Sequence, residues 1–387
     1  MHIGTPEQMD EHDGRITKNH VRTVTMQQIP EIQAALLFQE RILARVSRTF
    51  ALTIPELPGD LRTIVGNAYL LCRIADTIED DMELTPEAKT RFHDDLNHIV
   101  TGKLNPQRFA DALIPHLYAQ TPDAERELVA NSHAVMMVTA TFSDQTKASI
   151  SRCLTIMCRG MPTFQRHVSL AGLSDLDELN QYCYYVAGVV GEMLTDLFCE
   201  HSEAIASRRS LLMPLAASFG QGLQMTNILK DFWEDRGGGS CWLPRDIFLH
   251  EQCDLTHIQM GQDNNGFQNS MRLLIGITQA HLRNAFKYAL LIPPDETGIR
   301  NFCLWAIGFA VLSLQKLNHN LDFESGSEVK ISRTTVRRVT RMVRWTVRHD
   351  RLLSWMFQLV VRGLPETQPT LVKLAVKNQK LPLSELD

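Results

Sequence analysis

Apolar residues recur at helical intervals along most of the chain. Proline inside a helix costs about 3 kcal/mol, so long helices are expected in the stretches that lack it. These proline-free stretches are residues 59–85, 123–161, 163–213, 215–243 and 295–364. In the first of them, apolar side chains return every three or four residues, at Leu61, Ile64, Val65, Ala68 and Leu71. Alternating β-branched runs between tight turns are lacking. The pattern predicts an all-α fold of many long helices separated by prolines.

No stretch of sequence divides the chain into two domains. Neither a repeat of 20–50 residues nor a linker rich in glycine and serine is visible, so we expect one large domain over residues 29–365. Residues 1–28 are polar and charged and are expected to be a disordered tail, and residues 366–387 are expected to be a polar C-terminal tail. The most apolar stretches, 304–314 and 352–364, are shorter than the roughly 20 residues that cross a bilayer. We therefore expect a soluble or peripheral protein.

Charge and cysteine content indicate which partners and which cellular compartment the protein is expected to have. Lysine and arginine number 39 against 44 aspartates and glutamates, a net charge of −5, so no overall positive field favours nucleic acid. The eight cysteines form no CxxC pair and lie in apolar stretches. Such cysteines are typical of buried thiols in a reducing compartment, which predicts a cytoplasmic protein.

Two acidic segments share the pattern DxxED, one from Asp76 to Asp80 and the other from Asp231 to Asp235. Positions i and i+4 lie on one helical face, so each segment directs two carboxylates the same way. Asn227 extends the second stripe by one turn. Carboxylates that share a cavity must be neutralised by cations or protons. Mg²⁺ fits this pattern, because it takes one or two carboxylates and keeps positions open for phosphate oxygens.

A single DxxxD would ordinarily indicate a solvated helix face. Here each copy follows an apolar helical segment, residues 67–75 and 223–229, which predicts carboxylates at the ends of buried helices. Arg73 and Lys230 accompany the two copies. Carboxylates for metal with arginine and lysine for phosphate are the components of a metal-bridged diphosphate site.

A third segment, residues 182–194, has a helical pattern that contains Gly188 and Gly191. Each glycine costs a helix about 1 kcal/mol relative to alanine. The glycines serve either close helix packing or the clearance of an apolar tunnel beside Tyr182.

Four segments, in this order, resemble the squalene synthases of the squalene and phytoene synthase family. They are Ser47-Arg48-Thr49-Phe50 and residues 69–81, 182–191 and 226–235, within a resemblance over residues 40–335. The resemblance implies helices packed around a central cavity, the isoprenoid synthase type. It also implies head-to-head condensation of two farnesyl diphosphates through presqualene diphosphate, Mg²⁺ as the metal, and NADPH as the reductant that yields squalene.

The resemblance also implies roles for individual residues. The metal ligands would be Asp76, Asp80, Asp231 and Asp235, with Glu79 and Asn227 in support. Diphosphate or dinucleotide phosphate would contact Ser47, Arg48 and Arg73, and Tyr182 would lie at the reacting carbons. The carbocation needs a dry wall with aromatic faces, for which Phe50 and Phe302 are candidates.

One segment favours the reductive step, whereas two positions differ from the residues that the family usually has and leave it open. The sequence has no GxGxxG, but residues 329–333 resemble the flap that covers the nicotinamide in squalene synthases, with Lys330 and Arg333 as cofactor contacts. Ser240 stands where the family usually has an arginine, so Arg236 or Arg245 would have to replace that phosphate contact. Ala306-Ile307 likewise replaces the usual Pro-Gln.

Several alternative functions stay open. Within the family, the chain could stop at presqualene diphosphate or make dehydrosqualene or phytoene without reduction. Chain-elongating prenyltransferases and terpene cyclases also use paired acidic helices, and a helical scaffold without activity would tolerate loss of both carboxylate stripes. Products formed from farnesyl diphosphate with Mg²⁺, with and without NADPH, distinguish these alternatives.

Seven arginines fall between residues 333 and 351, interleaved with apolar residues. One interpretation is a solvated helix whose apolar side packs on the domain. The other is a peripheral docking face for an anionic membrane, which would suit an enzyme with a hydrocarbon product.

Overall fold

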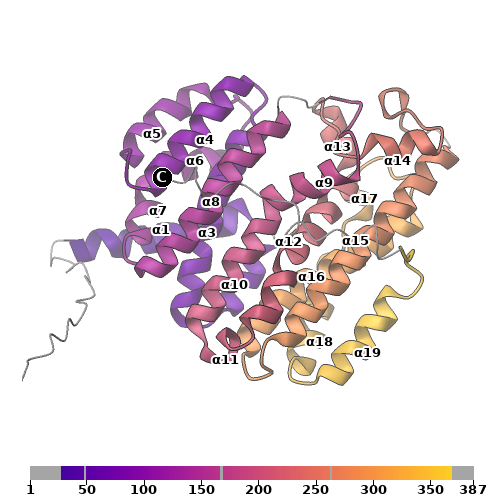
Figure 1. The fold of residues 1–387 in the computed structure, drawn as a ribbon. Helices are drawn as coiled ribbons and strands as arrows, with labels where there is room; N and C mark the ends of the chain where they lie inside the picture. The colour runs from indigo at the N-terminus through magenta and orange to yellow at the C-terminus, as the bar shows by residue number, and fades with distance from the viewer. Residues whose placement is uncertain (1–27, 48, 166–168, 262–263, 368–387) are drawn as a thin grey trace, which may run out of the picture.

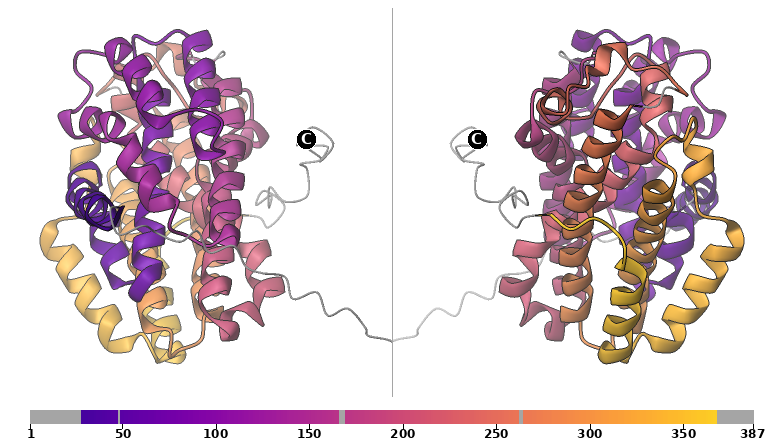
Figure 2. Two further views of the ribbon diagram at one scale, coloured as in Figure 1. Left: turned by 90° about the vertical axis from the view of Figure 1, so that its left-hand side faces the viewer. Right: turned by 90° about the vertical axis from the view of Figure 1, so that its right-hand side faces the viewer.

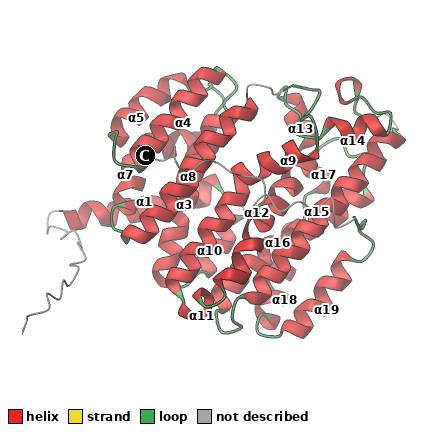
Figure 3. Cartoon of the chain, viewed as in Figure 1, coloured by secondary structure: helices red, strands yellow, loops and turns green. Residues whose placement is uncertain are grey.

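A computed structural model describes residues 28–47, 49–165, 169–261 and 264–367. Within these ranges the chain is helix and loop without a strand, apart from one isolated bridge between Leu173 and Pro244 (Figure 3). The predicted all-α fold is therefore confirmed. The predicted tails, 1–28 and 366–387, lie outside the described residues except for residues 28, 366 and 367, so their boundaries stay predictions.

The helices follow one another with short connections. The first part of the chain forms α1 (Gln28–Val46), α2 (Phe50–Thr53), η1 (Ile54–Glu56), α3 (Gly59–Asp80), α4 (Pro86–Val100), α5 (Pro106–Leu113), η2 (Ile114–His116), α6 (Asp123–Ala130) and α7 (Ser132–Thr139). The middle forms α8 (Asp144–Gln165), α9 (Leu176–Cys183), the π-helical turn η3 (Tyr184–Gly188), α10 (Val189–His201), α11 (Glu203–Ala206), α12 (Arg209–Lys230), α13 (Phe232–Gly237) and α14 (Arg245–His250). The last part forms η4 (Leu255–His257), α15 (Asn265–Leu291), α16 (Thr297–His319), α17 (Gly326–Val329), α18 (Arg333–Thr346) and α19 (Asp350–Val361).

Helix α12 runs through the middle of the bundle. It packs against α10, α15, α16 and the π-helical turn, while α3 and α8 pack together on the side of α4–α7 (Figure 1). Its buried residues include Leu212, Ala216, Phe219 and Leu229. One hydrophobic cluster extends from Ala35 to Leu364 through this arrangement.

Proline does not separate the helices as consistently as the sequence pattern predicts. Thr85-Pro86 and Asn105-Pro106 do begin helices, with the Thr85 hydroxyl and the Asn105 amide oxygen accepting backbone N–H groups of the first turn. Pro162 and Pro214, however, lie inside α8 and α12, so the predicted breaks there are wrong. Each proline removes the hydrogen bond that an N–H at its position would donate four residues back, and the packing of α8 and α12 outweighs this local cost.

The glycines of the third segment serve helix packing. A Cβ atom on Gly191 would lie 2.1 Å from the backbone oxygen of Ala216 in α12. Reciprocally, a Cβ atom on Gly220 of α12 would lie 2.0 Å from the oxygen of Ala187. The packing interpretation of Gly191 is therefore confirmed, and this pair of close approaches lets α12 pack against α10 and the π-helical turn. Gly191 and Ala187 also line the cavity described below, so the tunnel interpretation is compatible with the packing.

One helix has the length and composition of a membrane span. Helix α16 is long and apolar enough by these criteria, so the prediction that no stretch reaches that length is wrong. Most of its apolar stretch is buried inside the bundle, in contact with α12, α15 and α18.

All eight cysteines are free, and seven of them are buried.

We expect Gly191→Ala to lower the free energy of unfolding by about 1–3 kcal/mol, because the new methyl group overlaps the α12 backbone. Urea unfolding followed by circular dichroism measures the change. Gly237→Ala is the matched control, because a Cβ atom there meets nothing within 4 Å. Equal stability of the two variants would contradict the packing role of Gly191.

Candidate active site

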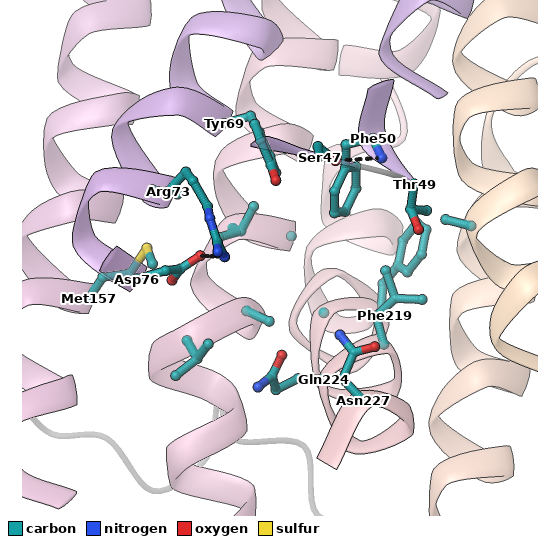
Figure 4. A pocket seen from close by; sticks show the side chains of 18 of the residues that line it. Ser47, Thr49, Phe50, Tyr69, Arg73, Asp76, Met157, Phe219, Gln224 and Asn227 are labelled. Carbon is teal, nitrogen blue, oxygen red and sulfur yellow. Dashed lines mark hydrogen bonds and ion pairs between the residues drawn. The ribbon is translucent and has the colours of Figure 1, made fainter. Parts of the chain in front are cut away.

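A cavity of about 550 Å³ lies between α3, α8, α10, α12 and α16 (Figure 4). Its lining combines a group of carboxylates and basic side chains, which we call the acidic end, with a group of aromatic and aliphatic side chains, which we call the apolar end. The predicted central cavity is therefore present, and its lining is amphipathic.

Both acidic segments reach this cavity. Its lining includes Asp76, Glu79 and Asp80 from the last turns of α3, together with Asp231 and Asp235 from the end of α12 and from α13. Helices α3 and α12 are largely buried along their length, and the acidic side chains that reach the cavity lie at or just beyond their C-terminal ends. The structure thus brings together the four residues predicted as metal ligands and the two predicted to support them, Glu79 and Asn227.

Asp81, which follows the first acidic segment, has a different environment. Its carboxylate accepts the backbone N–H groups of Glu83 and Leu84 at 2.9 Å each and that of Tyr118 at 2.7 Å. These bonds turn the chain at the end of α3. Asp81 therefore positions the segment and does not face the cavity.

The carboxylates lie in a desolvated and negatively charged environment. Burial raises the pKa of Asp76 to about 7, and the nearby carboxylates of Asp80 and Glu125 add to this while Arg73 opposes it. Burial likewise raises the pKa of Asp235 to about 7, with Asp231 and Asp80 contributing. Because Asp80 on α3 raises the pKa of Asp235 on α13, the two stripes act on each other across the cavity.

Glu79 is the most deeply buried carboxylate of the group. Burial raises its pKa to about 8, with the Asp80 carboxylate as the next cause. Its Oε1 accepts a hydrogen bond from Gln165 Nε2 at 3.2 Å, and Lys89 Nζ donates to the Glu79 backbone oxygen. Glu79 is thus held by α4 and α8 beside the aspartates.

Two basic side chains partly compensate this charge. Arg73 lies 3.7 Å from Asp76, and its Nη2 donates to Glu125 Oε1 at 2.5 Å. Lys230 Nζ lies 2.9 Å from Asp231 Oδ2 and donates to Asn227 Oδ1 at 3.1 Å. Glu125, on α6, was missed by the sequence analysis, because no motif or spacing links it to α3.

The segment before α2 closes one wall. Ser47 lines the cavity, and its hydroxyl accepts the backbone N–H of Phe50 at 2.9 Å (Figure 4). Arg48 lies outside the described residues. Across the cavity, Figure 4 shows Gln224 and Asn227 of α12 opposite Arg73 and Asp76.

Aromatic rings from three helices line the apolar end. The Phe50 ring lies 5.3 Å from that of Tyr69 and 6.4 Å from that of Phe302. Phe198 packs behind Phe302 with the rings nearly perpendicular. Phe50 and Phe302 therefore lie on one wall of the cavity, as their predicted role as a common aromatic wall requires.

Tyr182 is buried and lines the cavity with the carboxylates on one side. Its ring stacks on Trp242 with centroids 4.1 Å apart and planes 4° apart, and Phe164 contacts it edge-on. Burial raises its pKa, with Glu79 and Asp80 contributing, so its hydroxyl stays protonated at neutral pH. Trp242, from the loop after α13, is a cavity residue that the sequence analysis did not single out.

The residues of the predicted flap do not line the cavity itself. Lys330 reaches the acidic end, with its Nζ 3.9 Å from Asp231 Oδ1, whereas Arg333 is exposed at the start of α18. The flap is attached to the second acidic segment, because the Gly326 N–H donates to both carboxylate oxygens of Glu234, at 2.9 and 3.2 Å.

Arg236 cannot replace the arginine that the family has near Ser240. Its guanidinium donates to the backbone oxygens of Leu255, Thr256 and Ile258 at 2.7–3.1 Å. It therefore fixes the following loop, and the suggested substitution by Arg236 is wrong.

The donor set fits Mg²⁺ that is shared with a phosphate ligand. Among the described residues, no group of three His, Cys, Asp or Glu side chains is placed to hold a metal ion alone. Mg²⁺ requires about six oxygens and keeps several waters, so one or two carboxylates per ion suffice when phosphate supplies others. The pairs Asp76–Asp80 and Asp231–Asp235 meet this requirement.

Comparison with known proteins gives consistent matches. A family model described as squalene/phytoene synthase matches residues 43–335. Squalene synthase clz20 of Cochliobolus lunatus is 32% identical over 230 residues, 59% of this chain and 52% of that protein. Squalene synthase ERG9 of Saccharomyces cerevisiae is 27% identical over 305 residues, 78% of this chain and 65% of that protein. The chain spans about half the length of the first curated relatives that it matches.

Solved structures share the fold. A complex of TcSQS with the ligand E5700 superposes with a TM-score of 0.68 at 22% identity, covering 87% of this chain and 94% of that chain. A dehydrosqualene synthase in complex with a ligand gives 0.59 at 20% identity, covering 82% of this chain and 98% of that chain. The predicted isoprenoid synthase type of fold is thereby confirmed.

We expect the metal-free protein to lose stability as the pH rises from about 5 to about 8. The folded pKa of about 7 for Asp76 and Asp235 lies above the unfolded value of about 4, so the folded state binds more protons in this window. The stabilisation is complete below the unfolded pKa and is lost through the folded pKa. Thermal unfolding with a chelator measures the slope.

Added Mg²⁺ should raise the unfolding temperature most at the upper end of this pH window, because metal replaces the protons. Asp76→Asn should flatten the pH dependence, while Asp94→Asn, an exposed aspartate on α4, should leave it unchanged. A chelated wild-type protein whose stability does not change over this range would contradict the electrostatics described here.

Proposed function

The chain belongs to the squalene/phytoene synthase family, and from that premise we propose that it is a squalene synthase. It would join two farnesyl diphosphates head-to-head through presqualene diphosphate and reduce the product with NADPH. The observation that carries the proposal is one cavity with facing carboxylate stripes at one end and an aromatic wall at the other.

The acidic end is proposed to hold the diphosphates. Asp76, Asp80, Asp231 and Asp235 would bind Mg²⁺, with Glu79 and Asn227 in support. Bound Mg²⁺ would supply positive charge that stabilises the departing diphosphate. The supporting observations are the raised pKa values of Asp76 and Asp235, since they indicate anions that lack sufficient opposite charge.

Arg73 and Ser47 are proposed to contact the diphosphate oxygens, and Arg48 is proposed on its motif position alone. Glu125 holds the Arg73 guanidinium at the edge of the cavity before substrate arrives. An arginine fixed in this way loses little entropy when it binds phosphate, so it can stabilise negative charge as the leaving group departs.

The apolar end is proposed to protect the carbocation. The faces of Phe50 and Phe302 can stabilise a cation by about 0.5–2 kcal/mol each. Aliphatic side chains beside them exclude water, which would otherwise capture the cation as an alcohol. Tyr182 lines the cavity near the carboxylates with its ring stacked on Trp242, and we propose that it contacts the reacting carbons.

Lys330 and Arg333 are proposed to hold NADPH phosphates outside the cavity. The support is the position of Lys330 near Asp231 and the attachment of the flap to Glu234. A dinucleotide bound here would enter over the acidic end. Dehydrosqualene or presqualene diphosphate as the final product is the alternative, and product analysis decides between them.

We expect Asp76→Asn and Asp231→Asn to lower the formation of presqualene diphosphate by about 100-fold or more, because each removes a ligand that acts on the leaving group. Radiolabelled farnesyl diphosphate with Mg²⁺ gives the rate. Asp94→Asn is the surface control. Turnover within a fewfold of wild type in either cavity variant would refute the metal assignment.

Lys330→Ala combined with Arg333→Ala should separate the two half-reactions. Condensation needs no hydride, so farnesyl diphosphate should still be consumed while presqualene diphosphate, dehydrosqualene or alcohols accumulate. Each lost charged contact is worth about 1.5–3 kcal/mol, or roughly 10- to 150-fold in cofactor affinity. High NADPH should partly restore squalene.

Arg341→Ala, on the exposed side of α18, is the matched control for this double variant. Unchanged dependence on NADPH in the double variant would remove the flap from the cofactor site. If the wild-type protein makes only dehydrosqualene with NADPH present, the squalene assignment itself fails.

A further inference from the structure

Helices α18 and α19 form an outer layer of the molecule on the side of α15 and α16 (Figure 2). We call their outward surface the α18–α19 face. Its exposed residues are Arg337, Arg338, Arg341, Met342 and Trp345 on α18, then Arg348, Arg351, Leu352, Trp355, Leu359 and Arg362 on and around α19.

Helix α18 has two distinct sides, and the packing interpretation of the arginine-rich run holds for its inner side. Val343 and Val347 are buried toward the bundle. The opposite side presents Trp345, which is 82% exposed and follows Arg338 and Arg341 at i+7 and i+4 on the same side of the helix. The apolar inner side is therefore satisfied by packing, while the outer side combines an exposed indole with arginines.

Helix α19 repeats this division. Leu353, Phe357 and Val361 are buried, and the Phe357 ring stacks on Phe286 of α15 at 4.2 Å. Leu352, Trp355 and Leu359 lie on the outer side with exposed fractions of 41%, 60% and 47%. Their i, i+3, i+7 spacing makes a continuous apolar stripe that the described residues leave uncovered.

Trp345 and Trp355 are exposed, whereas the other tryptophans of the chain are not. Trp233, Trp242 and Trp305 are all buried, so the exposed tryptophans of the described chain both lie on the α18–α19 face. A contiguous apolar surface that includes two indoles indicates a partner, because water is an unfavourable environment for it.

The charge of this face differs from that of the whole chain. Residues 333–362 contain eight arginines and one acidic residue, Asp350, whereas the chain carries a net charge of −5. Asp350 is paired with the buried Arg300, and Arg344 is paired with Glu56. Within the described residues, the remaining arginines of the face have no acidic partner, so the face is locally cationic.

We propose that the α18–α19 face docks on an anionic lipid bilayer. Tryptophan and leucine enter the boundary between headgroups and acyl chains, and the arginines around them bind lipid phosphates. A second copy of the chain fits less well, since a two-fold interface would set the arginine clusters against each other. The negative remainder of the surface would be repelled by the same bilayer, which orients the molecule.

Docking in this orientation has a consequence for the catalytic cavity. Helix α18 packs on α16, and α16 supplies Phe302 and Ala306 to the apolar end. The apolar end would therefore lie on the bilayer side of the molecule. A cavity on the bilayer side would suit a hydrocarbon product, and this advantage rests on the proposed function. The proposed lipid binding does not depend on that function.

Vesicle flotation with the full chain tests the proposal. We expect binding to vesicles of phosphatidylglycerol and phosphatidylcholine in equal parts, weaker binding to phosphatidylcholine alone, and loss of binding as NaCl rises from about 0.1 M to about 1 M. Arg338→Gln with Arg341→Gln should weaken binding about fivefold per residue. Trp345→Ser with Trp355→Ser should weaken it by about tenfold or more.

Leu37→Ser with Arg159→Gln is the matched control, because both residues are exposed on other helices. Circular dichroism establishes that each variant is folded. Brominated phosphatidylcholine in the anionic vesicles should quench Trp345 fluorescence in Trp355→Phe, and the quenching should disappear when Trp345 is also replaced by Phe. This readout does not depend on catalysis.

Three results would overturn the proposal. The first is equal vesicle binding by wild type and the tryptophan double variant. The second is a wild-type dimer that dissociates on the same substitutions and does not bind vesicles. The third is binding to an acidic peptide but not to anionic lipid.

Discussion

The cavity depends on carboxylates that are gathered where water is scarce. Asp76, Glu79 and Asp235 all have raised pKa values because burial and neighbouring carboxylates both disfavour their anions. Helices α3 and α12 make this possible, because the packing of their long buried lengths outweighs the cost of holding acidic groups at their C-terminal ends. The stability of the bundle thus maintains an unfavourable concentration of negative charge that bound protons or cations can relieve.

The basic side chains around the aspartates neutralise their negative charge only in part. Arg73, Lys230 and Lys330 lie close to the aspartates but cannot balance them. Glu125 adds a further negative charge and in return fixes Arg73 from the neighbouring helix α6. Under the proposed function, this arrangement would favour an anionic ligand bound together with metal ions, and the aromatic wall of the same cavity would favour the opposite charge.

The basic residues of the chain are divided between two purposes that composition alone does not separate. Arg300 and Arg236 are used within the fold, where they bind backbone oxygens. The arginines of α18 lie on the surface, next to exposed tryptophan. With a net charge of −5, a single cationic face can orient the whole molecule, which a uniformly basic protein could not do.

Local pattern was enough to predict the helices and the two acidic stripes, because helical periodicity and i, i+4 spacing depend only on neighbouring residues. The aromatic candidates Phe50 and Phe302 rested instead on the family resemblance. Local pattern failed at Pro162 and Pro214, where packing carries a helix past a local interruption. Glu125 beside Arg73, Trp242 beneath Tyr182 and Arg236 in its loop were decided by the tertiary structure alone. Each of these depends on a contact between separate elements, and such contacts follow from how the helices pack and not from any spacing along the chain.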